Sequence, residues 1–296
     1  MNASDSILDV RKLKQYFHVN KNLTMKAVDD VSFQIKKGEI FGLVGETGSG
    51  KSTIARTIMG IYPAVEGEIY FKGEMISNQR IFRQNKKKVR RNMQTIFQDS
   101  AAALNPRMTI EQIIAEPLRI HRLASGKKEL QEKIDRLLLE VGLDSSLKSK
   151  YPGEISGGQR QRVAIARCIG MDPDLIIADE PIASLDISIQ AQIVTLFQDL
   201  QRKYGFTFLF IAHDLSIIRF ISDKVGVMLQ GKMMEMAPTK ELFENPLHPY
   251  TKALLSAVPV PDPIYEKNKK ILTYDVNSLK PDGHMTEVLP GHLVYQ

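Results

Sequence analysis

The stretch from Glu39 to Thr53 constrains the fold more than any other part of the chain. An apolar run that ends at Val44 leads into a glycine-rich turn, and a helical pattern begins near Ser52. Glycine lets such a turn adopt backbone conformations that are closed to other residues. The N–H groups of the turn and the positive end of the helix dipole together make an anion site. The order strand, turn, helix therefore predicts a nucleotide-binding loop rather than a chance match.

Individual positions of this loop have expected partners on a nucleotide. Lys51 is placed to reach the β- and γ-phosphates, and the Ser52 hydroxyl to ligate a magnesium ion. The predicted ATP-binding residues of the loop are Gly45, Glu46, Thr47, Gly48, Ser49, Gly50, Lys51, Ser52 and Thr53. Upstream, Tyr16 and Phe17 form an aromatic pair, which either packs within a strand or stacks on the adenine base.

Composition sets broad bounds on the class of protein. A chain of 296 residues, 43% hydrophobic and 25% charged, suggests one large or two modest globular domains. The longest apolar run, 206–212, is too short to span a bilayer, and the first residues show no signal-peptide pattern. We expect a cytosolic chain that reaches a membrane only through partners. The net charge of +6 does not choose among nucleic acid, anionic lipid and ATP.

Two smaller features exclude some chemistry. The single cysteine, Cys168, rules out an internal disulfide and a multi-cysteine metal or iron–sulfur site within this sequence. Its apolar helical surroundings favour a core residue over a nucleophile. The basic cluster from Lys86 to Arg91 is typical of a solvated helix face, with membrane proximity or nucleic acid as alternatives.

Strands that alternate with helices predict the α/β class. Several strands are continuous apolar runs, which favours a mostly parallel sheet covered on both faces. We expect strands at 7–13, 31–35, 39–44, 68–71, 93–97, 175–178, 207–211, 225–229 and 232–236, helices at 52–61, 187–204 and 215–221, and a helix-rich insert at 109–142. A polar loop is expected at 20–25, and the proline-containing tail from Pro259 onward is expected to pack loosely on the surface.

Polar side chains at the ends of three predicted strands could act on a bound nucleotide. Asp179 could hold Mg²⁺, and the adjacent Glu180 could orient the attacking water or accept its proton. Gln98 could touch the metal and the water. His213 could polarise the γ-phosphate, although a lone histidine is more often structural. The predicted catalytic residues are Glu180, His213, Gln98 and Lys51, and the predicted metal ligands are Ser52, Gln98 and Asp179.

A second glycine-rich anion site precedes a predicted helix at Ser156, Gly157, Gly158 and Gln159. A single-site nucleotide-binding enzyme needs only one such site. A head-to-tail dimer uses two, because the second closes the ATP bound to the opposite subunit. The pattern therefore favours a dimer with shared sites.

These motifs, in this order, closely resemble those of the ATP-binding subunits of ABC transporters. The matches are Walker A (Gly45–Thr53), the Q-loop (Gln98), the signature (Ser156–Arg160), Walker B (Leu175–Glu180), the D-loop (Ala183–Asp186) and the H-loop (His213). The resemblance covers about residues 7 to 260. It implies a P-loop NTPase fold of ABC type, with an antiparallel β subdomain and a helical subdomain at about 104–168. It also implies Mg-ATP hydrolysis in a dimer sandwich, in which Asp186 joins Ser156–Gln159 as an ATP contact in trans.

Further segments resemble the oligopeptide/dipeptide importer group. They are Leu104–Thr109, Asn245–Leu255 and the end, Leu289–Leu293, which is similar to the F-type subunit of the D/F pair. The resemblance implies a nucleotide-binding domain at 1–260 and a C-terminal extension of this importer type at 261–296. Ile155 replaces the usual leucine of the signature, and Ala183-Ser184 reverses the usual D-loop order while Asp186 is kept.

The function implied by the resemblance is ATP hydrolysis that powers oligopeptide or dipeptide import, at the cytoplasmic face of the membrane. Implied partners are a second, related ABC ATPase subunit, two transmembrane permease subunits and, indirectly, an extracytoplasmic peptide-binding protein, with no nucleic acid. One alternative is an importer ATPase for nickel or another solute. The other is a soluble ABC ATPase that acts on nucleic acid or the ribosome. The latter is disfavoured by the short interval between Gln98 and Ser156, which leaves no room for a long coiled coil, and by the single cassette.

Overall fold

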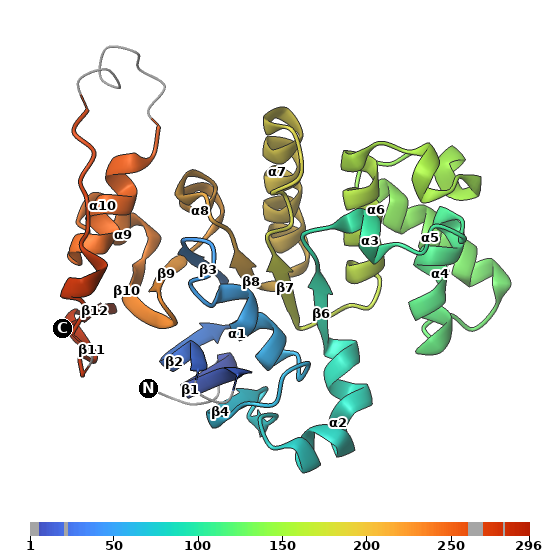
Figure 1. Ribbon diagram of the computed structural model, residues 1–296. Helices are drawn as coiled ribbons and strands as arrows, with labels where there is room; N and C mark the ends of the chain where they lie inside the picture. The colour runs from blue at the N-terminus through green and yellow to red at the C-terminus, as the bar shows by residue number, and fades with distance from the viewer. Residues whose placement is uncertain (1–5, 21–22, 260–268, 281) are drawn as a thin grey trace. The chain divides into compact units, whose positions relative to one another are not determined.

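The computed structural model describes residues 6–20, 23–259, 269–280 and 282–296, and these residues form two compact units. The first unit combines the described residues up to Ile81 with those from Leu209 onward, and the second runs from Phe82 to Phe208. Figure 1 shows the elements of each unit, labelled in chain order. Among the described residues, no helix has both the length and the apolar character needed to cross a membrane.

An antiparallel sheet forms one layer of the first unit, in the order β2-β1-β4-β5. Its strands are β1 (Ser6–Asn20), β2 (Leu23–Lys36), β4 (Glu66–Phe71) and β5 (Glu74–Met75). The expectation of a polar loop at 20–25 is wrong, because β1 continues to Asn20 and β2 begins at Leu23. Backbone pairing such as Phe17 with Met25 sustains this hairpin. The side chains of Leu23 to Lys26 are exposed and give no pattern of burial that sequence could signal.

A second sheet of this unit carries the predicted nucleotide loop. The strands of this sheet from β11 to β3 follow the order β11-β12-β10-β9-β3, with β3 and β9 parallel and the other pairs antiparallel. The strands are β3 (Ile40–Gly45), β9 (Lys224–Leu229), β10 (Lys232–Pro238), β11 (Met285–Leu289) and β12 (His292–Tyr295). The helices of this unit are α1 (Lys51–Ile58), α8 (Leu215–Ile221), α9 (Thr239–Glu244) and α10 (Pro249–Ala257), with a 3-10 turn at Val276–Ser278. Every residue of β3 is buried, as its continuous apolar run predicts.

The expectation of a loosely packed tail is wrong for its last residues. β12 pairs with β10, and its residues Val294 and Tyr295 are buried. The side chain of His292 is completely inaccessible to solvent. The expectation failed because the tail forms a hairpin with its own turn at Pro290-Gly291, and the hairpin adds two strands to the sheet edge.

The second unit combines two parallel strands with a group of helices. β6 (Met93–Ile96) pairs with β7 (Leu175–Asp179), and β8 (Thr207–Ile211) follows at the change from one unit to the other. The helices are α2 (Gln79–Asn92), which begins just before this unit, α3 (Ser100–Ala103), α4 (Ile110–Ile120), α5 (Lys127–Glu140), α6 (Gly157–Ile169) and α7 (Ile187–Tyr204), with 3-10 turns at Ser145–Ser149 and Pro152–Glu154. α6 packs against α3, α4 and α5.

Side-chain burial in this unit agrees with the expected pattern. Ile113, Ile114 and Leu118 of α4 are buried, as their spacing on one helix face predicts. Cys168 is a buried core residue, and burial raises the pKa of its thiol to about 12. The basic residues 86–88, 90 and 91 lie exposed on α2 around the buried Val89. The predicted α/β class, with parallel strands and an antiparallel subdomain, is confirmed.

Candidate functional site

The predicted phosphate loop joins the end of β3 to the start of α1. Gly45, Gly48 and Gly50 all have positive φ, at 148°, 84° and 105°. A Cβ atom on Gly45 would lie 2.2 Å from the Met228 carbonyl oxygen, and one on Gly50 would lie 2.1 Å from the Ala27 carbonyl oxygen. Only glycine fits these two positions. A Cβ on Gly48 would meet nothing within 4 Å, so that glycine borders open space.

Lys51 lies inside this loop. Only 4% of the residue is exposed, and its Nζ donates to the carbonyl oxygens of Gly45 and Glu46 at 2.7 and 2.9 Å. The N-cap residue of α1 is Gly50, which has no side chain to satisfy the first helical N–H groups. An ammonium group, uncapped helix amides and open space at Gly48 together fit a phosphate group.

The two upstream aromatic residues have different surroundings. Adjacent residues of a strand face opposite sides, so the rings of Tyr16 and Phe17 cannot both face one ligand. The Tyr16 hydroxyl donates to Asp29 Oδ1 at 2.5 Å. Burial is the larger cause and this hydrogen bond the second cause of a raised pKa of Tyr16. The Phe17 ring meets the edge of Tyr62, with ring centroids 5.1 Å apart. Phe17 is therefore the stronger candidate for stacking on a base.

His213 lies on the same sheet edge as the loop. It follows Ala212, whose N–H donates to the Leu43 carbonyl at 3.2 Å, and it precedes α8. Its side chain is exposed. The first unit thus brings the loop residues and His213 to one edge of a sheet.

The carboxylates and Gln98 share an edge in the second unit. Ile96 of β6 is in register with Ala178 of β7, so Gln98 and the Asp179-Glu180 pair follow the same ends of two parallel strands. Asp179 is buried, Glu180 is half-buried and Gln98 is exposed. Glu180 has a φ of 49°, a conformation that costs a non-glycine residue energy and often marks functional sites.

No group of three or more acidic, histidine or cysteine side chains that could hold a metal occurs among the described residues. A magnesium ion binds through one or two carboxylates and completes its shell with phosphate oxygens and water. Carboxylates at the end of a buried strand are the oxygen donors that such an ion prefers.

The second predicted anion site begins α6. The Ser156 hydroxyl accepts the Gln159 N–H at 3.2 Å, and Gln159 Oε1 accepts the Ser156 N–H at 2.9 Å. This capping box fixes the start of the helix. A Cβ on Gly158 would lie 2.8 Å from Ile189 Cγ2, whereas one on Gly157 would meet only ordinary contacts at 3.7 Å and beyond. Packing within the chain therefore requires glycine at 158 but not at 157.

The turn before α7 presents Asp186. This residue is the N-cap of α7, its side chain is exposed, and it makes no capping hydrogen bond. Gln190 Nε2 holds the turn by donating to the carbonyls of Ile182 and Leu185 at 3.1 and 2.9 Å. Next to Asp186, Ile187 is 85% exposed.

One residue beside the phosphate loop has no signal in the local sequence. Tyr250, in the first turn of α10, is only 2% exposed, and the carboxylate of Glu46 lies close enough to affect its ionisation. Nothing in the sequence around position 250 indicates a loop that lies far upstream.

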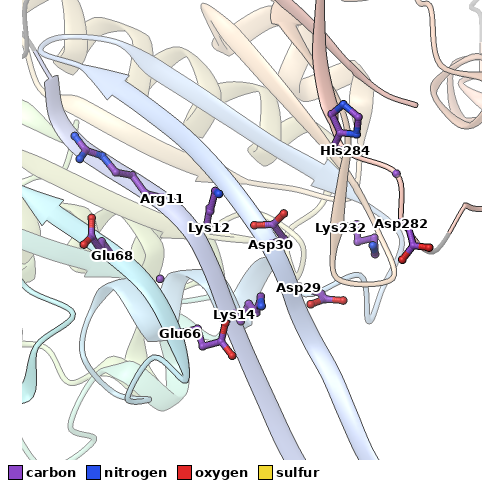
Figure 2. A pocket seen from close by; sticks show the side chains of 12 residues that line it. Arg11, Lys12, Lys14, Asp29, Asp30, Glu66, Glu68, Lys232, Asp282 and His284 are labelled. Carbon is purple, nitrogen blue, oxygen red and sulfur yellow. Dashed lines mark hydrogen bonds and ion pairs between the residues drawn. The ribbon is translucent and has the colours of Figure 1, made fainter.

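A separate charged hollow in the first unit contains none of the predicted site residues (Figure 2). It has a volume of about 1040 Å³ and is lined by β1, β2 and β4 on one side and by Lys232 and residues 282–284 on the other. Several of its charges are paired, such as Arg11 with Asp9 at 2.6 Å and Lys14 with Glu66 at 2.7 Å. Its basic and acidic groups largely compensate each other, which does not suit a nucleotide.

Known protein families show to which family a chain with these motifs belongs. A family model described as ABC transporter matches residues 28–183, more than half of the chain. The chain belongs to the ABC transporter family. A second model, described as the C-terminal region of oligopeptide/dipeptide transporters, matches residues 234–281 of this ABC cassette.

Relatives of the cassette match over nearly their whole length. The oligopeptide transport ATP-binding protein OppF of Bacillus subtilis (strain 168) is 54% identical, over 98% of this chain and 96% of its own. The oligopeptide transport ATP-binding protein AmiF of Streptococcus pneumoniae serotype 4 is 46% identical, over 99% of this chain and 95% of its own. The predicted resemblance to the ATP-binding subunits of this importer group is confirmed.

Solved structures support the same fold. The structure of cbiO1 from Clostridium perfringens, part of the ABC transporter complex cbiONQ, is 29% identical with a TM-score of 0.71, over 81% of this chain and 92% of that one. The dimeric post-hydrolysis state of the ATP-binding cassette MJ0796, bound to ADP and Pi, is 26% identical with a TM-score of 0.70, over 78% and 98%. The predicted P-loop NTPase fold of ABC type is confirmed.

Proposed function

We propose that this chain is the ATP-binding and hydrolysing subunit that powers import of oligopeptides or dipeptides through an ABC transporter. The observation that carries the proposal is the near full-length similarity to relatives named for oligopeptide transport, which continues through the C-terminal region. ATP is the nucleotide, and Mg²⁺ is the metal that its phosphates require. The cassette would act as a peripheral subunit at the cytoplasmic face of the membrane.

The residues of the first unit would bind the nucleotide. The loop amides and Lys51 would hold the phosphates, Phe17 would stack on the base, and His213 would face the γ-phosphate. In the second unit, Glu180 would orient the attacking water and accept its proton. Ser52, Asp179 and Gln98 would hold Mg²⁺, which neutralises phosphate charge when bound.

The signature and the D-loop would complete the site of a second ATPase subunit. Ser156–Gln159 and Asp186 are exposed or half-buried, and the neighbouring Ile187 is 85% exposed. We propose that this partner is a related, non-identical subunit, by family tendency. Two transmembrane permease subunits and, indirectly, an extracytoplasmic peptide-binding protein would complete the assembly, with no role for nucleic acid.

The proposed division of the chain follows the same reasoning. Residues 1–260 would form the nucleotide-binding domain, with its helical subdomain at about 104–168. Residues 261–296 would form the C-terminal extension, of which 261–268 and 281 lie outside the described residues. The β10–β12 pairing ties the end of this extension to the sheet that carries the phosphate loop.

A Gly157→Ala variant tests the contact in trans. The added methyl group meets no close neighbour within the chain, so we expect the free energy of unfolding to stay the same or rise slightly, since alanine favours helix. ATP hydrolysis by the assembled transporter should fall by about tenfold or more, because the methyl group would push the opposite nucleotide away from a productive position. Denaturant unfolding and phosphate release measure the two effects.

Gly158→Ala is the matched control for this variant. Its methyl group would collide with Ile189, so it should lower the stability of the chain itself. A Gly157→Ala transporter with wild-type hydrolysis would contradict the contact in trans.

Transport in a defined membrane tests the function itself. The cassette would be co-expressed with its permease and partner subunits, reconstituted into vesicles, and supplied with Mg-ATP, the cognate binding protein and either labelled tripeptide or nickel. ATP-dependent accumulation of peptide is the expected result. Accumulation of nickel alone would favour an importer ATPase for nickel. A cassette that purifies with rRNA or DNA instead of permease would favour a soluble ABC ATPase.

A further inference from the structure

One helix, α2, carries the whole positive excess of the chain. Its 14 residues include seven lysine or arginine side chains and no acidic one. Without them, 33 of the 40 basic residues remain against all 34 acidic residues, so the rest of the chain has a net charge of −1. The seven side chains are all exposed, and they belong to Arg80, Arg83, Lys86, Lys87, Lys88, Arg90 and Arg91.

A solvated helix elsewhere in the same chain has a different composition. α5 also has 14 residues, but it carries four basic and four acidic side chains. One of its pairs, Lys133 with Glu129, lies at 2.9 Å with the spacing i, i+4. In α2 the same spacing places Arg83 beside Lys87, and Lys87 beside Arg91. Like charges at this spacing destabilise a helix. Contact with water alone therefore does not explain the composition of α2.

Both ends of α2 are held, so the direction of its faces is set. Asn78 Oδ1 accepts two N–H groups of the first turn, at 2.9 and 3.2 Å. At the other end, the Asn92 carbonyl accepts the Asp174 N–H at 2.8 Å, and β6 begins at the next residue. Val89 is buried and marks the inner face. Spacings of four, seven and eight residues place four basic side chains together on a face turned away from Val89. They are Arg83, Lys87, Arg90 and Arg91.

This basic face fits a flat anionic surface. Among the described residues, no carboxylate forms an ion pair with any of its four side chains. A helix of 14 residues is only about 21 Å long. An extended nucleic acid would soon pass beyond it onto a surface without positive excess. The single aromatic residue of α2, Phe82, is half-buried and so is poorly placed to stack on a base. Clusters of four to eight basic residues on an amphipathic helix are typical of binding to anionic lipid headgroups.

We propose that the basic face of α2 binds the anionic phospholipid headgroups of the membrane in which the transporter works. The contact is electrostatic, because none of the three apolar side chains of α2 is exposed. It is also direct, whereas the sequence predicted membrane association only through partners. The choice of a membrane over a nucleic acid rests on the proposed function. The binding itself requires neither permease nor peptide.

Vesicle binding by the purified full chain tests the proposal. Vesicles of phosphatidylcholine with about one-third phosphatidylglycerol supply the anionic surface, and vesicles of pure phosphatidylcholine are the neutral control. We expect binding to the anionic vesicles only. This binding should weaken at least about tenfold between about 0.05 and 0.5 M salt, because salt screens the contact. Co-sedimentation with the vesicles measures both effects.

A fourfold variant tests whether α2 makes the contact. Its substitutions are Arg83→Gln, Lys87→Gln, Arg90→Gln and Arg91→Gln. Binding to the anionic vesicles should fall by about a hundredfold or more. The melting temperature should stay close to wild type, because all four side chains are exposed. A matched control removes the same charge from exposed lysines elsewhere and should weaken binding less than about threefold. Its substitutions are Lys127→Gln, Lys128→Gln, Lys240→Gln and Lys252→Gln.

Three results would overturn the proposal. The first is a wild-type chain that does not bind the anionic vesicles at low salt. The second is an equal loss of binding in the fourfold variant and its matched control. The third is tighter binding to a short DNA duplex than to the anionic vesicles, which would assign the basic face to nucleic acid. Peptide import without lipid binding by the chain alone would overturn only this proposal. Lipid binding without peptide import would instead overturn the proposed function.

Discussion

A Glu180→Gln variant is expected to bind ATP with wild-type affinity and to hydrolyse it at least about a hundredfold more slowly. The amide has nearly the size of the carboxylate, so the nucleotide site keeps its shape. It cannot accept a proton from water, so the proposed catalytic base is lost. Glu180 already adopts a φ of 49°, and glutamine in its place adds no new backbone strain. The free energy of unfolding should therefore stay close to that of wild type.

Phosphate release and titration calorimetry with Mg-ATP separate hydrolysis from binding in this variant. Asp172→Asn is a matched control, because Asp172 is also an acidic residue with positive φ, at 50°, but lies in an exposed turn after α6. It removes the same charge and should leave hydrolysis unchanged. Hydrolysis by Glu180→Gln near the wild-type rate would remove Glu180 from the catalytic role.

A Gly45→Ala variant should lose about 3 kcal/mol or more of folding stability and bind no ATP. The backbone at Gly45 has a φ of 148°, and the added Cβ would lie 2.2 Å from the Met228 carbonyl oxygen. Both atoms belong to rigid neighbouring strands, so neither can move aside easily. Denaturant unfolding measures the stability, and titration calorimetry measures the binding.

Two further glycines make this experiment specific. Gly48→Ala and Gly73→Ala each place a Cβ in open space at positive φ, so each should cost only about 1 kcal/mol. Gly48→Ala should nevertheless weaken ATP binding, because its methyl group would enter the space proposed for phosphate. Gly73 lies in the turn between β4 and β5, and its variant should bind ATP normally. Equal losses of stability for Gly45→Ala and Gly48→Ala would contradict the clash with Met228.

Local signals in the sequence were sufficient for the central elements of the fold. The glycine turn between β3 and α1 can be predicted because glycine spacing, apolar strand and helix start lie within one short stretch. The helix Ile187–Tyr204 has the predicted bounds, since its apolar spacing is regular and Gly205 ends it with a φ of 68°. These elements depend on interactions between residues that are close in sequence.

Elements that depend on distant pairing could not be predicted in the same way. The outer part of the β1–β2 hairpin has exposed side chains, so its backbone pairing leaves no hydrophobic pattern. The last hairpin did carry a turn signal at Pro290-Gly291, between residues that favour strands. Its pairing with β10, where His292 meets Glu235, joins residues 57 positions apart, and the sequence offers no link between them.

The residues of the candidate site could likewise be predicted only where local spacing signals them. Motif spacing predicted the loop, the carboxylate pair and the second glycine site, and the choice of residues remains a prediction. Sequence could not distinguish Tyr16 from Phe17, because the hydrogen bond from Tyr16 to Asp29 crosses between two strands. It also could not reveal Tyr250, whose relation to Glu46 exists only after the chain has folded.

The buried pair of Glu235 and His292 also has a consequence for biogenesis. His292 follows Glu235 by 57 residues, and the phosphate loop precedes both. Because a chain leaves the ribosome from its N-terminus, Glu235 and the segment before α10 emerge well before His292. We expect the sheet edge at β10 to stay incompletely packed until β12 has left the ribosome and paired with β10.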